Sequence, residues 1–188
     1  TTTGIAFSVP PGAYLRLAGT NWDEGSNLHP DERHMMFVFG DTQVGLDALK
    51  PGELSASQLW FSAGLSPLDP RRKGGLYVYG ELPHLSVVLA AYLTGTTGWA
   101  YVLLLARSMG AILDSYTILA VFLLANATLR NGMASLVAAA LYAFSPMAIQ
   151  QSNFFMVDAW LTSAGAWCLV ASTMLLRAQS RREAVLWA

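Results

Sequence analysis

Three long apolar segments dominate the second half of the chain. Residues 102–128, 133–151 and 157–176 are rich in Leu, Ala and Val on every face of a helix. A helix needs roughly 20 apolar residues to cross the bilayer hydrocarbon, which is about 30 Å thick. A surface helix of a soluble protein would instead carry a polar stripe. The pattern therefore predicts three transmembrane helices, and a soluble helical bundle is the less favoured alternative.

Residues 19–80 follow a different pattern, in which acidic and basic side chains occur among scattered Gly and Pro, and we assign this stretch to a predicted loop that covers residues 19–101. We expect a long loop outside the hydrocarbon that carries short juxtamembrane helices. Asp31–Phe39 is predicted to be one of them, because Pro30 suits the first position of a helix. Residues 82–97 are apolar but short and end in a Thr/Gly run. They are predicted to form an interfacial helix on the outer leaflet rather than a span.

Residues 1–18 are predicted to be the outer end or remnant of a first transmembrane helix. Ile5–Leu17 is mostly apolar, but it is too short to span and Pro10–Pro11 interrupts it. No charged region precedes it, which is unlike a signal peptide.

Cationic residues set the predicted topology. Arg130 lies between the segments 102–128 and 133–151, and Arg177, Arg181 and Arg182 follow the last segment. Short basic loops face the cytoplasm, so the region 19–101 is expected outside and the tail after 176 is expected to be cytoplasmic. The predicted fold is an all-α integral membrane bundle with a long extracytoplasmic first loop, in a bacterial or archaeal plasma membrane.

Composition supports a membrane protein and excludes several other classes. The 188 residues are 54% hydrophobic and only 12% charged, against about 25% charged in a soluble domain. The net charge of −1 provides no field for polyanions, so no nucleic-acid partner is expected. The single cysteine, Cys168, excludes an internal disulfide and a Cys-rich metal site.

The few charges inside the apolar half point to chemistry. They are Arg107, Asp114 and Asp158, and ionisable groups in or beside hydrocarbon are costly and by default suggest function. Asp114 lies two helical turns from Arg107, too far for a direct pair, so we expect another helix to satisfy it. Asp158 and the pair Asp31–Glu32 are placed on one outer face by the predicted topology.

Four short motifs occur in the order of a known family. They are Asn27–His34 (NLHPDERH), Tyr77–Pro83 (YVYGELP), Arg107–Ala111 (RSMGA), and Ser145–Pro146 followed by Gln150–Ser152 and Phe154–Asp158. Together they resemble polyprenyl-phosphate-dependent membrane glycosyltransferases of the GT-C class, in particular the protein O-mannosyltransferases and aminoarabinose transferases. The resemblance covers most of residues 14–177.

The resemblance implies a helical membrane bundle that transfers a sugar from an isoprenoid phosphate to an acceptor outside the membrane. It implies that Asp31, with Glu32 beside it, is a general base or helps to hold a metal. It implies that Asp158 orients the acceptor. Such transfer needs a base for the acceptor hydroxyl and positive charge for the departing phosphate.

Several residues are candidates for that positive charge or for a metal. Arg107 is the first candidate for the phosphate, because Arg can bind phosphate with two hydrogen bonds. Arg71 and Arg72, with Lys73, form a second candidate clamp, and His29 is a candidate substrate-binding residue. A divalent metal is also predicted as an option, with ligands from His29, Asp31, Glu32 and His34.

Each candidate also has a structural interpretation. Carboxylates at helix starts stabilise the helix, and Arg107 could extend to lipid headgroups. Family members continue with further helices beyond the part that this chain resembles. The chain is therefore predicted to be either the N-terminal part of such an enzyme or, as the second interpretation, a non-catalytic accessory subunit that packs against the helices of other membrane subunits. Small residues such as Ala138–Ala140 and Gly165 permit close helix packing and fit both interpretations. A transporter is less well supported, because paired interrupted helices are not evident in the sequence.

Overall fold

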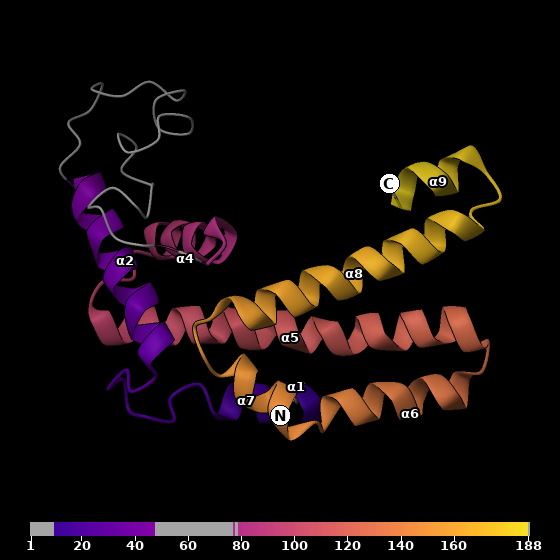
Figure 1. Cartoon of the computed structure of the whole chain (residues 1–188), viewed down its shortest axis with the longest axis horizontal. Coiled ribbons are helices and arrows are strands. Elements are labelled where there is room, and N and C mark those ends of the chain that lie inside the picture. Colours follow the sequence, from indigo (N-terminus) through magenta and orange to yellow (C-terminus); the bar gives the residue numbers. More distant parts are fainter. Residues whose placement is uncertain (1–9, 48–76, 78, 188) are drawn as a thin grey trace, which may run out of the picture. The chain divides into compact units, whose positions relative to one another are not determined.

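The computed structural model describes residues 10–47, 77 and 79–187 (Figure 1). Within these residues every regular element is an α-helix and none is a strand, which confirms the all-α prediction. The helices are α1 (Pro11–Ala18), α2 (Pro30–Asp47), α4 (Glu81–Thr94), α5 (Trp99–Leu129), α6 (Gly132–Ala143), α7 (Pro146–Ser152), α8 (Val157–Arg177) and α9 (Arg181–Trp187).

The chain divides into two compact units. The first, here called the helical unit, comprises Thr1–Asn21, Ser108–Phe154 and Asp158–Ala188. The second, here called the loop unit, comprises Trp22–Arg107 and Phe155–Val157. Helix α5 begins in the loop unit and continues in the helical unit, because the division falls between Arg107 and Ser108.

Two helices, α5 with 31 residues and α8 with 21, are long and apolar enough to cross a membrane. The predicted segment 133–151 is not one straight helix, which corrects the sequence prediction. It is broken into α6 and α7, whose axes are bent by 55°. The cause is Pro146, because proline has no N–H for the carbonyl of Tyr142 and its ring clashes with the preceding turn. The pair counts as a third span only if the two helices cross together.

The ends of the shorter helices also differ from the sequence predictions. Helix α2 begins at Pro30, one residue before the predicted Asp31, and it continues to Asp47 rather than ending at Phe39. Pro11 is the first residue of α1, where its missing N–H costs nothing, so this helix begins at the predicted interruption at Pro10–Pro11. Helix α4 has 14 residues, about 21 Å, which is too short to cross the hydrocarbon alone. Its interfacial position stays a prediction.

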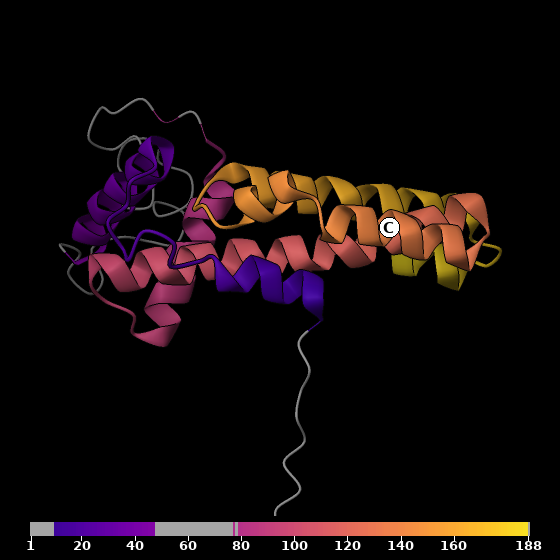
Figure 2. The same ribbon diagram turned by 90° about the horizontal axis from the view of Figure 1, so that it is seen from below.

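The helical unit buries small residues and exposes large ones. Helices α6 and α8 flank α5 (Figure 1), and α1 lies beside α5 and α6 (Figure 2). Alanines 111, 120, 139 and 143 are buried, whereas leucines 119, 136, 161 and 169 are exposed. Small residues let membrane helices approach closely, and lipid can cover the large apolar ones. This distribution supports the membrane assignment.

In the loop unit, α2 packs against α4. Met35, Met36 and Phe39 on α2 are buried, as are Val87 and Ala91 on α4. The fully buried His84 extends this contact, since its Nε2 lies 2.9 Å from the Thr42 hydroxyl. Burial lowers the pKa of His84 to about 4, so the imidazole is neutral and belongs to the core.

Candidate functional site

A buried ionic cluster of Arg107, Asp23 and Glu32 is the centre of the loop unit. Arg107 donates from Nη1 and Nη2 to the two carboxylate oxygens of Asp23, at 2.7 and 2.9 Å. It also donates from Nε and Nη2 to those of Glu32, at 2.8 and 2.6 Å. The three side chains are at most 1% exposed. One guanidinium thus holds two carboxylates bidentately, the strongest geometry for such pairs.

Backbone groups complete the hydrogen bonding of this cluster. The Phe155 N–H donates to Glu32 at 2.7 Å, and the Gly25 and Leu28 N–H groups donate to Asp23 at 3.2 and 3.0 Å. The Trp22 ring centre lies 5.5 Å from the guanidinium carbon. The hydrogen bonds from Arg107 hold the pKa of Asp23 well below its usual range, although burial opposes them. The Asp23 carboxylate therefore stays ionised.

The chain between Asp23 and Pro30 is folded to make these contacts. Glu24, Gly25 and Asn27 have φ angles of 52°, 79° and 53°, a left-handed conformation that few non-glycine residues adopt. It turns the backbone N–H groups back towards Asp23. Asn27 is only 3% exposed, and within the described part of the chain neither its amide oxygen nor its amide nitrogen has a partner. Such strain is kept where the surrounding structure fixes it.

Asp31 lies one residue before Glu32, in the first turn of α2. Its side chain is half-buried, and its carboxylate has no hydrogen bond or ion pair to the residues that the structure describes. The positive end of the helix dipole lies at the N-terminus of α2 and stabilises a carboxylate there. The two neighbouring carboxylates therefore have different roles. Glu32 fixes the start of α2 through its hydrogen bonds, and the carboxylate of Asp31 remains accessible.

The other predicted site residues are only partly brought together. His34 stacks 6.2 Å from the Tyr77 ring and lies 6.1 Å from that of Tyr79, so it belongs to an aromatic group. Among the described residues no three His, Cys, Asp or Glu side chains are placed to share a metal ion. The predicted metal at His29, Asp31, Glu32 and His34 gains no support. Arg71, Arg72 and Lys73 lie outside the described residues.

The predicted phosphate role of Arg107 stays a prediction, and the geometry gives this residue a structural role. Its Nε, Nη1 and Nη2 all donate to Asp23 or Glu32. A phosphate would have to displace a carboxylate to reach these donors.

A second ionic cluster, in the helical unit, joins α1, α5 and α6. Arg16 of α1 is fully buried, and its Nε lies 2.5 Å from the Asp114 carboxylate. The Tyr142 hydroxyl donates to the other oxygen of Asp114 at 2.5 Å. The expectation that another helix satisfies Asp114 is confirmed. Arg16 was not predicted as the partner, although a single Arg in an apolar run and a lone Asp in an apolar helix are a recognisable pair.

Arg16 also donates hydrogen bonds to backbone carbonyls at the break between α6 and α7. It donates to the carbonyl oxygens of Ala143 at 2.9 Å and of Tyr142 at 3.3 Å. These are the carbonyls that a straight helix would bond to residues 147 and 146. Unsatisfied carbonyls are costly in hydrocarbon, so Arg16 stabilises a bend that Pro146 imposes.

Asp158 lies in the first turn of α8, in the helical unit, whereas Asp31 belongs to the loop unit. Asp158 is half-buried and lines a cavity of about 340 Å³ together with Asp114, Tyr142 and Gln151. Its predicted role in orienting an acceptor stays a prediction.

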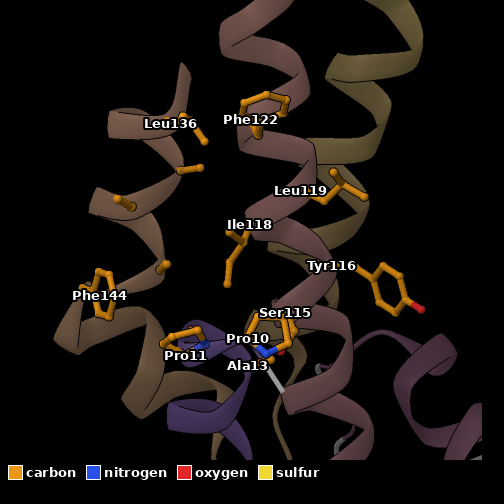
Figure 3. Close-up of a pocket in the computed structure, with 14 residues that line it drawn as sticks. Pro10, Pro11, Ala13, Ser115, Tyr116, Ile118, Leu119, Phe122, Leu136 and Phe144 are labelled. Carbon is orange, nitrogen blue, oxygen red and sulfur yellow. The ribbon is translucent and has the colours of Figure 1, made fainter. Parts of the chain in front are cut away.

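An apolar groove of about 710 Å³ occupies another face of the helical unit. It lies between α1, α5 and α6, and Figure 3 shows Pro11, Ile118, Phe122, Leu136 and Phe144 around it. Almost all of its lining is hydrocarbon, so it suits an alkyl or isoprenoid chain rather than a polar ligand.

No known family, curated protein or solved structure matches the chain in any of three comparisons.

Proposed function

We propose that this chain is a membrane glycosyltransferase of the GT-C class, or a part of one, with Asp31 as its base. The donor is a polyprenyl-phosphate sugar and the acceptor carries a hydroxyl group. The observation that carries the proposal is the contrast within one motif. Glu32 is held by Arg107 and the Phe155 N–H, while Asp31 beside it has no partner among the described residues.

In the proposed reaction the acceptor oxygen attacks the anomeric carbon of the sugar. The bond between that carbon and the phosphate oxygen breaks, and the phosphate leaves with the electron pair on its lipid. Asp31 takes the proton of the acceptor hydroxyl, which is the task of a general base. The half-buried position of Asp31 suits a group that must meet a substrate.

The buried cluster supports this role by fixing position rather than by adding stability. Burying ionised groups costs several kcal/mol per ion, and the attraction between them often does no more than offset that cost. Their best-attested use is to specify one arrangement. Here the arrangement fixes the first turn of α2 at Glu32, and with it the backbone of Asp31.

The apolar groove of the helical unit supports a lipid-linked donor. An isoprenoid tail needs a continuous hydrocarbon surface, and Ile118, Phe122 and Leu136 provide one within the described residues. The groove contains almost no polar surface, so it would hold the tail and leave the sugar phosphate to other groups.

The test compares Asp31→Asn with Asp41→Asn, an exposed position on the same helix. The full chain in liposomes is given a panel of polyprenyl-phosphate monosaccharides together with a panel of hydroxyl-bearing acceptors, and consumption of each glycolipid is followed by mass spectrometry. Loss of a general base typically costs 10²–10⁴-fold in rate, so we expect at least about a 100-fold loss for Asp31→Asn. Asp41→Asn should behave as the unmodified chain. Equal consumption by both variants would overturn the assignment of Asp31.

An accessory subunit is the second candidate, and the internal pairing of Arg107 favours it. The residue expected to bind phosphate is used to hold the fold. On this alternative the chain copurifies with other membrane proteins in fixed ratio and does not bind polyprenyl phosphate.

A further inference from the structure

We propose that the cavity beside the break between α6 and α7 binds a small molecule through a protonated amine, with Asp158 as the counter-ion. The cavity has a volume of about 340 Å³, within the range of small-ligand pockets. It lies entirely in the helical unit. The proposal does not rest on glycosyl transfer and concerns a site apart from Asp31.

Polar side chains without partners converge on this cavity. Ser145, Gln151, Asp158 and Thr162 line it, and none of their side chains has a hydrogen-bond partner among the described residues. The Gln151 Oε1 atom is buried and unsatisfied. A buried acceptor without a partner is unfavourable, because it has lost its hydrogen bonds to water. A ligand that donates hydrogen bonds would recover that cost.

The charges around the cavity select a cation. Asp114 also lines it, but Arg16 neutralises this carboxylate and Tyr142 donates to it. Asp158 has no cationic partner within the described part of the chain, and no Lys or Arg is among the lining residues. The cavity therefore keeps one uncompensated negative charge, which disfavours a phosphate or carboxylate ligand.

The hydrogen-bonding groups narrow the cation to an ammonium group. The carboxylate of Asp158 and the amide oxygen of Gln151 are acceptors, and the hydroxyls of Ser145 and Thr162 can accept as well. A protonated primary amine has three donors and no acceptor, so it matches this set. A bare metal ion would leave most of the volume empty.

The break between α6 and α7 contributes residues to the lining of the cavity. Ser145 lies at the break and Gln151 lies on α7, and both reach the cavity because α7 bends away by 55°. Irregular backbone is tolerated at membrane depth where it is buried or lines a cavity. Broken helices commonly form ligand sites in membrane proteins. The carbonyls freed at the break are already bonded to Arg16, which leaves the side chains for a ligand.

Ethanolamine and its neutral analogue ethylene glycol are the probes that test the proposal. The full chain in detergent is titrated with each at pH 7, and binding is measured by saturation-transfer NMR. We expect ethanolamine to bind at least tenfold more tightly than ethylene glycol. Asp158→Asn should weaken ethanolamine at least tenfold. Glu183→Gln, an exposed carboxylate of α9, is the matched control and should leave binding within twofold.

Several results would overturn the proposal. They are equal binding of ethylene glycol, unchanged binding by Asp158→Asn, and full displacement of ethanolamine by a tenfold excess of sodium chloride. If Asp158→Asn fails to fold, Thr162→Val and Gln151→Leu replace it. Each is expected to weaken ethanolamine about threefold, and unchanged binding in both would equally refute the site.

Discussion

At the scale of single residues, two buried arginines carry much of the polar architecture. Arg107 joins two carboxylates in the loop unit, and Arg16 joins Asp114 to the broken end of α6 in the helical unit. Both use the planar fork of guanidinium donors, which Lys does not possess. In both clusters each buried charged side chain is paired with a group of opposite charge.

Removal of Arg16 should destabilise the fold strongly. Arg16→Ala leaves the Asp114 carboxylate buried without a cation and removes the donor of the Ala143 carbonyl, whereas the Tyr142 carbonyl keeps the Ser145 N–H. Breaking one partner of a buried pair costs about 3–5 kcal/mol, and we expect a loss of that size. The double variant Arg16→Ala/Asp114→Ala should lose less than the sum of the single changes. Thermal unfolding in detergent measures both, with the exposed Arg181→Ala as control. Additive losses would contradict a direct pair.

At the scale of elements, the sequence predicted the helices whose signals are local. α5 and α8 follow from their apolar length, and the start of α2 follows from Pro30. The break before Pro146 was not predicted, because the surrounding apolar run is long enough for one span.

Close packing of α1 depends on Gly12. A Cβ at this position would lie 2.9 Å from the Ile118 Cδ1 atom and 3.0 Å from the Ala143 Cβ atom. Overpacking of this kind costs about 1–3 kcal/mol, so Gly12→Ala should lower the unfolding temperature. Gly132→Ala is the matched control, because nothing lies within 4 Å of its Cβ position. Ile118→Val removes the nearest atom and should restore part of the stability. Absence of any rescue would argue against this contact.

At the scale of the whole molecule, the sequence could predict a membrane protein but only part of its candidate site. Asp31, Glu32 and Asp158 were found from their motifs. The partners of Glu32 were not, because Arg107 and Phe155 lie 75 and 123 residues away from it and no spacing rule joins them. For the same reason Asp114 was recognised as a residue in need of a partner, while Arg16, 98 residues away, was not named. Contacts between distant residues depend on helix packing, which local patterns do not specify.

Labelling of single cysteines would test the predicted topology. In a Cys168→Ala background, cysteines are placed at Gly132 and Gln150, both exposed and at opposite ends of the segment α6–α7. If α6 and α7 cross the membrane together, an impermeant maleimide added outside intact cells should modify Gln150→Cys and not Gly132→Cys. Arg130 predicts this direction, because short basic loops face the cytoplasm. Permeabilised cells should label both, which shows that each thiol is reactive. Labelling of both positions in intact cells would mean that the broken pair re-enters on one side, and α4 would then need a new place in the topology.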